Sequence, residues 1–261
     1  MNMIRDPFDL TGKTMVMIGA GGMGRVMSLA MAYRGADIFS ADIDEASAEE
    51  TAELCSKVGV KAFSKKVDIS SPEDIESAFQ FVMNKFNKVD ILVNAVGITV
   101  HKPAQDLTLD EWDKVMNVNI RGTFLSCRAF GGQMLKQKKG SIINFSSIAG
   151  LAGLGRGNTV YSASKGAVVS YSRELAIEWA PSNVRVNVIV PCQFSGYKWD
   201  EFIRREYGDY DAMTAKFASN IPIGRIGTPE EMVAPVIFLA CDAASMVTGI
   251  VLPVDGGYLA K

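Results

Sequence analysis

Tyr161 and Lys165 lie four residues apart, just before an apolar run that predicts a helix, and this spacing is the most informative feature of the chain. Residues i and i+4 of a helix share one face, about 6 Å apart along the axis, so the phenol and the ammonium would converge there. A free tyrosine has a pKa of about 10, whereas a nearby cation favours the phenolate and lowers the pKa. The pair therefore predicts a base that takes a proton from an alcohol. The alternative is a solvated helix face, because the same spacing arises by chance in many helices.

The composition excludes several kinds of protein. The chain has 261 residues, of which 48% are hydrophobic and 21% charged, and its net charge is −2. These values are typical of a protein with one large core and unlike those of a disordered chain. Since no block of lysine or arginine occurs, we expect neither nucleic acid nor a membrane surface as a partner. No apolar run approaches the roughly 20 residues of a membrane span, and the start lacks a signal peptide's apolar stretch, so we expect a cytoplasmic protein.

Cysteine and histidine usage narrows the possible chemistry further. The four cysteines are scattered without a Cys-x-x-Cys pair, which favours buried reduced thiols over a redox or metal role: Cys55, Cys127, Cys192 and Cys241. His101 is the only histidine, so a multi-histidine zinc site is excluded, and we expect no metal. His101 is either a lone base or a loop residue, and the second interpretation is favoured. Acid–base chemistry must therefore rest on other residues, which raises the value of Tyr161.

Short apolar runs alternate with helical segments, a pattern that predicts an α/β fold of the Rossmann type, with a doubly wound parallel sheet and helices on both faces. The predicted strands are Thr14–Ile18, Asp37–Ala41, Val60–Val67, Ile91–Val93, Ser141–Phe145, Val184–Val190 and Gly249–Val254. The predicted helices are Gly24–Arg34, Glu45–Lys57, Pro72–Phe86, Leu109–Lys136 and Tyr161–Trp179. No linker, repeat or change in composition interrupts the chain, so we expect one domain over residues 1–261.

One segment, residues 193–222, is polar and aromatic without a strand signal. Insertions of this length in a compact domain are usually functional or disordered. This one begins where a predicted strand ends, at the edge where open α/β sheets bind ligands, so a substrate lid is favoured over a spacer. Its basic residues either attract an anionic substrate or keep a surface helix soluble, and the second interpretation is favoured: Lys198, Arg204 and Arg205.

The segment from Gly19 to Gly24 follows the first predicted strand and opens the first helix. Glycines there permit a tight turn and let backbone amides approach a pyrophosphate at the positive end of the helix. Asp42 ends the second strand about 20 residues on, where a carboxylate would accept hydrogen bonds from an adenosine ribose. A 2′-phosphate would be repelled there, so Asp42 favours NAD over NADP. Asp42 could instead cap the following helix, for which Asp44 is an equally good candidate.

Further residues appear in order along the chain: Asp68 after the third strand, Asn94–Gly97 after the fourth, Asn119, Ser147 placed 14 residues before Tyr161, Arg185–Asn187, Pro191, and the ending Thr248 to Gly257. With the glycine segment and the Tyr161–Lys165 pair, they resemble the short-chain dehydrogenase/reductase family over almost the whole chain. No single motif is decisive, but their order and intervals together are very hard to obtain by chance.

The resemblance implies a role for each matching residue. Tyr161 would be the general base, Ser147 would bind the substrate oxygen, Lys165 would lower the Tyr161 pKa and hold the nicotinamide ribose, and Asn119 would hold a proton-relay water. Asp68 would contact adenine, and Asn94–Gly97 would support the sheet beside the cofactor. The implied cofactor-binding set is Gly19, Gly22, Met23, Gly24, Asp42, Asp68, Ile69, Asn94, Gly97, Tyr161, Lys165 and Pro191.

The chain departs from the family pattern around the cofactor. Ile18 replaces a threonine, and the glycine loop is one residue shorter than usual. Ala95 and Val96 replace an asparagine and an alanine. Cys192 takes the place of a glycine, and Gly196 that of a threonine that often contacts the nicotinamide carboxamide, for which Ser195 could substitute. Since the catalytic residues are intact, we expect a working enzyme with altered cofactor contacts.

The resemblance therefore predicts NAD-dependent interconversion of a secondary alcohol and a ketone. The two ends of the chain look like the gluconate and deoxygluconate dehydrogenase branch, in which basic residues such as His101 and Lys102 could meet a substrate carboxylate. Polyols and other small hydroxy compounds stay open, as does the choice between dimer and tetramer. One alternative is a 3-oxoacyl thioester reductase that uses NADPH, and a second is a non-catalytic dinucleotide sensor or scaffold. A hydrolase is disfavoured because neither Ser146 nor Ser147 has a Gly-x-Ser-x-Gly setting.

Overall fold

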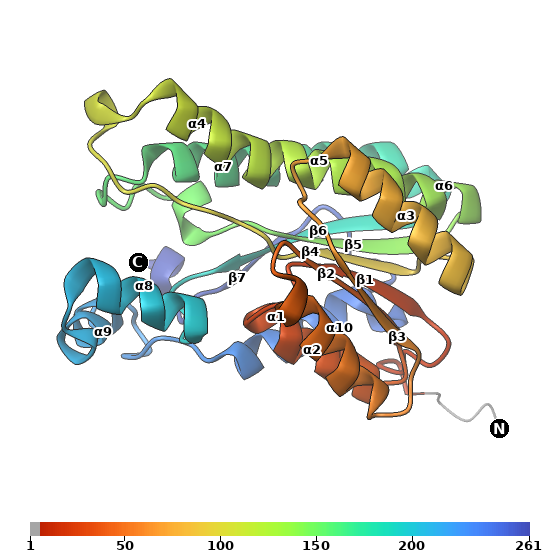
Figure 1. Ribbon diagram of the computed structural model, residues 1–261. Helices are drawn as coiled ribbons and strands as arrows, with labels where there is room; N and C mark the ends of the chain where they lie inside the picture. The colour runs from red at the N-terminus through yellow and green to blue at the C-terminus, as the bar shows by residue number, and fades with distance from the viewer. Residues whose placement is uncertain (1–5) are drawn as a thin grey trace.

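The computed structural model describes residues 6–261, whose strands form a single seven-stranded parallel sheet in the order β3-β2-β1-β4-β5-β6-β7 (Figure 1). The strands are β1 (Thr14–Ile18), β2 (Asp37–Asp42), β3 (Ala62–Lys66), β4 (Ile91–Asn94), β5 (Gly140–Phe145), β6 (Val184–Pro191) and β7 (Val251–Val254). The predicted α/β fold with a doubly wound parallel sheet is confirmed. Each predicted strand is present, and its ends differ from the prediction by at most about two residues.

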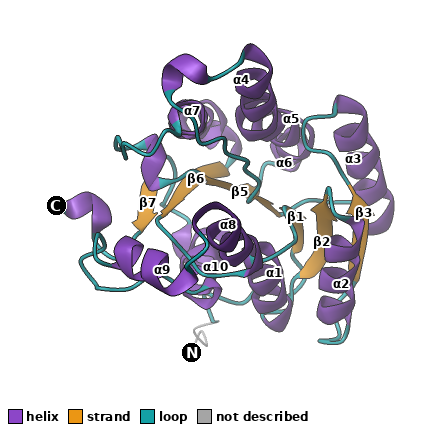
Figure 2. Ribbon diagram, turned by 60° about the vertical axis from the view of Figure 1, so that its left-hand side comes forward, coloured by secondary structure: helices purple, strands orange, loops and turns teal. Residues whose placement is uncertain are grey.

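Helices cover both faces of the sheet (Figures 1 and 2). One face carries α1 (Met23–Tyr33), α2 (Glu45–Ser56) and α10 (Val233–Ala240). The other carries α3 (Pro72–Phe86), α4 (Leu109–Met116), α5 (Gly122–Ser126), α6 (Gly132–Gln137) and α7 (Thr159–Trp179). The strand order reverses between β1 and β4, so the connections that follow these two strands leave toward opposite faces of the sheet and leave a crevice between them.

The central strands are buried on both faces, which explains their composition. Every residue of β1 is buried, and its sequence, Thr-Met-Val-Met-Ile, shows no alternation between polar and apolar side chains. Met17 packs with Met27 and Met31 in one core, whereas Val16 packs with Phe39 in the core on the opposite face. Continuous apolar strands of this kind are typical of parallel sheets covered by helices on both sides.

The predicted helix Leu109–Lys136 is not regular. Two π-helical turns, Asn117–Arg121 and Cys127–Gly131, separate α4, α5 and α6. A π turn inserts one extra residue into the helix and changes the direction in which the neighbouring side chains point. The first of these turns contains Asn119, so the irregularity coincides with a candidate site residue.

The strandless segment 193–222 contains two helices, α8 (Tyr197–Tyr207) and α9 (Tyr210–Ala218). Its two ends meet in an isolated parallel bridge between Phe194 and Gly227, in which the Ser195 amide donates to the Gly227 carbonyl at 2.8 Å and the Gly227 amide to the Gln193 carbonyl at 2.9 Å. A Cβ at Gly227 would lie 2.4 Å from the Phe194 ring, so only glycine fits there. The segment therefore projects from a closed base.

The sequence prediction did not include α10. Its start is marked by Thr228 and Glu231, which form a capping box ahead of the apolar run, with proline at the next position. The run itself reads Val-Ala-Pro-Val-Ile-Phe-Leu-Ala, and its uniform apolarity hides the helical period. Burial against β5 and β6, rather than the sequence pattern, explains this helix.

Two adjacent glycines of the long irregular helix give a matched test of packing. A Cβ at Gly131 would lie 2.5 Å from Cζ3 of Trp179, whereas one at Gly132 would meet nothing within 4 Å. We predict that Gly131→Ala lowers the free energy of unfolding by about 1–3 kcal/mol through overpacking. Gly132→Ala should raise it by roughly 0.5–1 kcal/mol, because alanine is the better helix former. Urea unfolding measures both, and equal effects of the two substitutions would contradict the packing.

Candidate functional site

A cavity of about 520 Å³ opens at the carboxyl ends of β1, β2 and β4, beside the base of the α8–α9 segment. Eight of the predicted cofactor-binding residues line it: Gly19, Gly22, Met23, Gly24, Asp42, Asp68, Ile69 and Gly97. The cavity is also lined by Ser195, which the sequence offered as a substitute for the threonine that contacts the nicotinamide. The other lining residues were not assigned to the cofactor: Ile18, Gly21, Ile43, Val67, Ser70, Ala95, Val96, Ile98, Lys114, Asn117, Val118, Phe194 and Gly196. Its position at the reversal of strand order is the place where open α/β sheets bind ligands.

The shortened glycine turn forms a cradle that a dinucleotide fits. Gly22 is the N-cap of α1 with φ +54°, and a Cβ there would meet nothing within 4 Å. A Cβ at Gly24 would lie 1.8 Å from the Gly19 carbonyl oxygen, so the turn closes only with glycine at that position. No side chain caps the helix, and no acidic residue lies in its first turn. The amides and the positive end of the helix dipole are therefore available to a pyrophosphate.

Asp42 is buried at the end of β2, and two backbone amides hold its carboxylate. One oxygen accepts a hydrogen bond from the Gly21 amide at 3.0 Å, and the other accepts one from the Asp44 amide at 3.1 Å. Asp44 occupies the N-cap position of α2, although its side chain makes no capping hydrogen bond to a backbone amide and instead accepts one from the Ser47 hydroxyl at 2.8 Å. Asp42 is therefore a fixed carboxylate in the cavity wall, with lone pairs left for further donors.

The remaining cofactor candidates differ in position. Asp68 lines the cavity, and its carboxylate accepts hydrogen bonds from both the amide and the hydroxyl of Ser70. Asn94 does not line the cavity, because its side chain is buried and bonded to Asn144 and Ser126. Pro191, the last residue of β6, is buried and also lies outside the cavity wall. The Asn94 side chain thus holds the sheet together behind the cavity.

Ser147 and Tyr161 come together although they lie on different elements. Ser147 follows β5 in an extended conformation, and Tyr161 is in the first turn of α7. The Ser147 side chain lies beside the Tyr161 hydroxyl and lowers its pKa as a hydrogen-bonding neighbour. Burial raises the pKa of Tyr161 above its ordinary value, and the hydrogen bond from Ser147 offsets part of that effect. The lowered pKa expected from the Tyr161–Lys165 spacing is therefore not found in the protein alone, because desolvation of the phenolate is the larger effect.

Lys165 is buried, with its ammonium held by two backbone carbonyls. Its Nζ donates to the Val96 oxygen at 3.1 Å and to the Phe145 oxygen at 2.9 Å, and it lies 5.9 Å from the centroid of the Tyr161 ring. Burial lowers the pKa of Lys165 to about 8. A Cβ at Gly97 would lie 3.0 Å from Nζ, so the absence of a side chain there leaves room for the ammonium.

Asn119 is fully buried in the first π-helical turn, and its side chain joins two elements. Its amide oxygen accepts from the Ile98 amide, and its amide nitrogen donates to the Ile98 carbonyl, both at 2.9 Å. The same nitrogen donates to the Ser164 hydroxyl at 2.9 Å, and that hydroxyl donates to the Tyr161 carbonyl at 2.8 Å. Asn119 therefore ties the loop after β4 to the turn of α7 that carries Tyr161 and Lys165.

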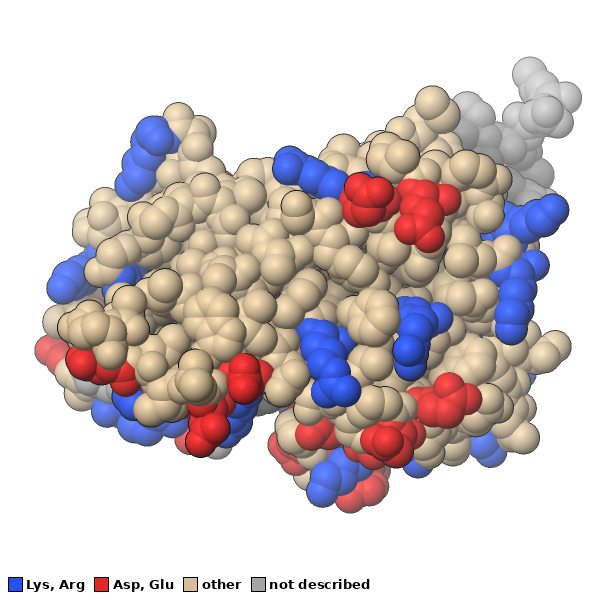
Figure 3. Space-filling model, turned by 90° about the horizontal axis from the view of Figure 1, so that it is seen from above, with Lys and Arg blue, Asp and Glu red and all other residues tan. Residues whose placement is uncertain are grey.

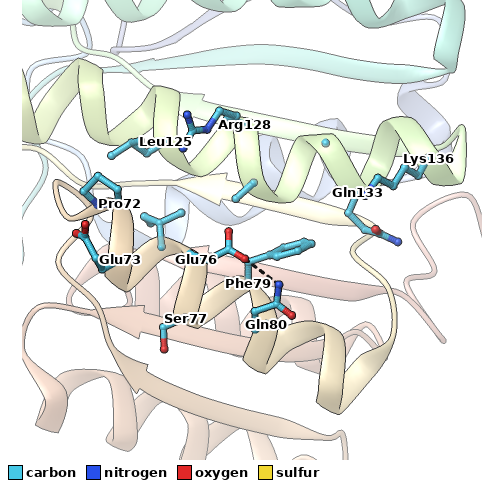
Figure 4. A pocket seen from close by; sticks show the side chains of 13 residues that line it. Pro72, Glu73, Glu76, Ser77, Phe79, Gln80, Leu125, Arg128, Gln133 and Lys136 are labelled. Carbon is cyan, nitrogen blue, oxygen red and sulfur yellow. Dashed lines mark hydrogen bonds between the residues drawn. The ribbon is translucent and has the colours of Figure 1, made fainter.

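A larger hollow of about 810 Å³ lies between α3 and the α5–α6 segment (Figure 4). Its wall includes Glu76, which accepts a hydrogen bond from Gln80 at 2.8 Å, and Arg128, but none of the predicted cofactor-binding residues. Ser147, Tyr161, Lys165 and Asn119 line neither cavity, but Lys165 donates to Val96 in the wall of the cavity at the strand ends. Within residues 6–261, no group of three or more metal-ligating side chains is found, and no helix is both long and apolar enough to cross a bilayer. The cavity at the strand ends is therefore the candidate active site.

Comparison with known proteins agrees with this geometry. A family model described as enoyl-(acyl carrier protein) reductase matches residues 19–259. The NAD-dependent glycerol dehydrogenase of Listeria innocua is 34% identical over 255 residues, 97% of this chain and 96% of that protein. The chain belongs to the short-chain dehydrogenase/reductase family. It is thus a member of a family of oxidoreductases that act on CH–OH groups, as predicted.

Two further relatives bear on the branch and on the cofactor. The 2-dehydro-3-deoxy-D-gluconate 5-dehydrogenase of Dickeya dadantii is 36% identical over 261 residues, 99% of this chain and 100% of that protein. A crystal structure from Beutenbergia cavernae with NADP bound at low occupancy has a TM-score of 0.90 and 36% identity, over 98% of this chain and 100% of that one. The family therefore binds a nicotinamide dinucleotide, and its members differ in whether NAD or NADP is the one named.

The pKa of Lys165 predicts how stability depends on pH. Its folded-state pKa of about 8 lies below the ordinary 10.5, so the buried ammonium costs stability below about pH 8, and the cost disappears as the pH rises toward 10.5. Against Lys165→Met, the free energy of unfolding of the wild type should therefore rise by roughly 3 kcal/mol between about pH 7 and pH 10.5. Urea unfolding of both proteins at several pH values measures this difference, and a flat difference would contradict the lowered pKa.

Proposed function

We propose that this protein catalyses the NAD-dependent interconversion of a secondary alcohol and a ketone, on a sugar acid, a polyol or another small hydroxy compound. The observation that carries the proposal is the approach of Ser147 and the Lys165 ammonium to Tyr161. The ammonium lies 5.9 Å from the tyrosine ring and donates to the carbonyl of Val96, which lines a cavity that fits a dinucleotide. The names of the glycerol and deoxygluconate dehydrogenase relatives support the substrate range.

In this mechanism the phenol oxygen of Tyr161 takes the proton of the substrate hydroxyl during oxidation and returns it during reduction. When bound, the nicotinamide ring accepts or supplies the hydride. The hydroxyl of Ser147 donates to the substrate oxygen and stabilises the charge that develops there. Since burial raises the pKa of Tyr161, the phenolate needs added positive charge, which the Lys165 ammonium supplies together with the oxidised cofactor. Asn119 keeps the loop and helix in register, and we assign it the proton-relay water.

The dinucleotide would lie with its pyrophosphate on the turn Gly19–Gly24 and its adenosine ribose at Asp42. The buried carboxylate is fixed by the Gly21 and Asp44 amides, so it cannot swing away from a 2′-phosphate. Like-charge repulsion in a buried site is much stronger than in water, which favours NAD over NADP. Ser195 and Gly196 lie in the cavity wall and would meet the nicotinamide end.

Two alternatives remain as proposals of lower rank. A 3-oxoacyl thioester reductase is supported by the acyl-carrier description of the matching family model, and it would reduce acetoacetyl thioesters faster with NADPH than with NADH. A non-catalytic dinucleotide sensor would bind NADH without turning over polyols, sugar acids or hydroxysteroids. The intact set of Ser147, Tyr161 and Lys165 disfavours the sensor.

Self-association into a dimer or tetramer is part of the proposal. The face formed by α4 to α7 shows few charged side chains over its central part (Figure 3). It carries exposed apolar residues, among them Leu109 at 81% and Ile177 at 73% exposure, which a partner copy would cover. Burial of these helices against their own sheet alone is the alternative, and sedimentation equilibrium distinguishes the two.

A cytoplasmic location stays a prediction.

Cofactor choice is tested by fluorescence titration of NADH and NADPH. The wild type should bind NADH at least about tenfold more tightly than NADPH, and Asp42→Ala should lose that preference, since the substitution removes the repelling carboxylate. Asp44→Ala is the matched control, because it changes the helix cap two residues away and leaves the Asp42 carboxylate in place. Equal binding of the two dinucleotides by the wild type would refute the assignment of NAD.

The role of Tyr161 is tested by steady-state kinetics with NAD⁺ over a panel of polyols and sugar acids. Tyr161→Phe should lower kcat by about 100-fold or more while NADH binding stays within a factor of about two, because only proton transfer is removed. Tyr171→Phe, on the same helix and packed on Phe124, is the control and should keep normal turnover. A Tyr161→Phe protein that retains more than about 5% of turnover would exclude this tyrosine as the base.

A further inference from the structure

The loop of residues 151–158, between Ser147 and the helix that carries Tyr161, contains one cation, Arg156. The loop is held on one side by the segment after β4: the Lys102 amide donates to the Gly157 carbonyl at 2.7 Å, and His101 Nδ1 lies 3.2 Å from the Arg156 carbonyl oxygen. Gly157 has φ +65°, and a Cβ there would lie 3.0 Å from the Lys102 carbonyl oxygen. The backbone at Arg156 is therefore fixed in position.

The Arg156 side chain reaches the α8–α9 segment on the other side of the loop. Its guanidinium carbon lies 4.6 Å from the centroid of the Phe217 ring, and Phe217 is buried in α9. Figure 1 shows α9 on the same side of the molecule as the loop that leads into α7. Stacking on a ring uses the face of a guanidinium and leaves the N–H groups along its edge free to donate.

Among the side chains that the structure describes, which exclude those of residues 197–199, 202 and 206, no carboxylate lies within 4.0 Å of the Arg156 guanidinium. Three other arginines, Arg25, Arg34 and Arg225, do have a carboxylate partner, and Arg225 makes a bidentate contact with Glu231 through two 2.7 Å hydrogen bonds. Arg156 thus presents a half-buried positive charge with no carboxylate partner among the described side chains, five residues before Tyr161 in the sequence. A planar donor edge of this kind matches a carboxylate in two parallel hydrogen bonds.

Lys102, which the sequence offered as a carboxylate contact, is already occupied. Its ammonium lies 2.5 Å from Oε1 of Glu111, and this hydrogen bond lowers the Glu111 pKa. The same carboxylate closes the capping box of α4 with Thr108, so the pair is fixed to the helix start. A substrate carboxylate would have to compete with Glu111 for Lys102, whereas at Arg156 it meets no competitor.

We propose that Arg156 is the carboxylate subsite of the active site and that Phe217 holds its guanidinium in place, so that an acid substrate is bound between the catalytic loop and α9. The inference rests on the proposed function and deepens it: the preferred substrates are hydroxy acids rather than neutral polyols. Because the guanidinium contacts Phe217, a carboxylate bound to it would lie against α9.

The test compares D-gluconate with D-glucitol, which differ only in a carboxylate against a hydroxymethyl group at one end. Binding to the complex of the full-length protein with NADH is followed by the fluorescence of the nicotinamide, and oxidation with NAD⁺ is followed in parallel. The wild type should bind gluconate more tightly than glucitol. Arg156→Gln should weaken gluconate binding and raise its KM by about 10- to 100-fold, with the effect on glucitol below about twofold.

Two further variants and the thermal stability of Arg156→Gln separate the contributions of charge, ring stacking and fold stability, and two more serve as controls. Arg156→Lys should recover part of the gluconate affinity, and Phe217→Leu should lose part of it, whereas Arg156→Gln should keep the thermal unfolding temperature of the wild type. Arg204→Gln is the matched control, since Arg204 stacks on Tyr210 at 4.7 Å within the same segment and should leave both ligands unaffected. Lys102→Gln should likewise change gluconate affinity by less than about twofold.

Equal losses for gluconate and glucitol in Arg156→Gln would overturn the subsite while leaving the proposed dehydrogenase intact. A wild type that binds NADH but prefers glucitol, or that binds neither compound, would also overturn it. Failure of the proposed function itself is recognised separately, by normal gluconate binding without any turnover of acids or polyols.

Discussion

The buried ammonium of Lys165 is the constraint on which the site depends. A cation removed from water is tolerated only where polar groups replace its hydration, and here the Val96 and Phe145 carbonyls do so. These carbonyls lie just after β4 and at the end of β5, so the lysine joins two neighbouring strands to α7. Gly97 has no side chain because the ammonium occupies that space. The contacts of Lys165 therefore fix the position of α7 relative to the ends of β4 and β5 and to Gly97.

The irregular helix from Leu109 to Gln137 also fixes α7 relative to the loop after β4, through the hydrogen bonds of Asn119. A regular helix would present Asn119 at a different angle, whereas the π turn directs its amide at Ile98 and Ser164. The amide is fully buried, and each of its hydrogen bonds is made within the protein, so the geometry is rigid before any ligand arrives. Preorganisation of this kind lets Tyr161 and Ser147 meet without rearrangement.

Much of this could be predicted from the sequence because the relevant signals are local. Strands buried on both faces read as apolar runs, and Gly19–Gly24, Asp42 and the Tyr161–Lys165 spacing each carry a short-range pattern. The π turns could not be predicted, since they depend on tertiary contacts rather than on periodicity, and α10 was hidden in a uniformly apolar run. The direction of the Tyr161 pKa depends on burial, which a sequence does not display. In the sequence, Lys102 and Arg156 are both cations close to candidate site residues. That Lys102 is paired with Glu111, and is therefore less available to a substrate, can be seen only in the structure.

The bridge between Phe194 and Gly227 has a consequence for how this protein could change over time. Because the two ends of the α8–α9 segment are clasped side by side at the sheet, the residues between them can be lengthened, shortened or exchanged without moving a strand. The catalytic residues all lie outside that interval. The length and composition of the α8–α9 segment can therefore change within one contiguous stretch of the chain while the residues proposed for proton transfer are inherited unchanged.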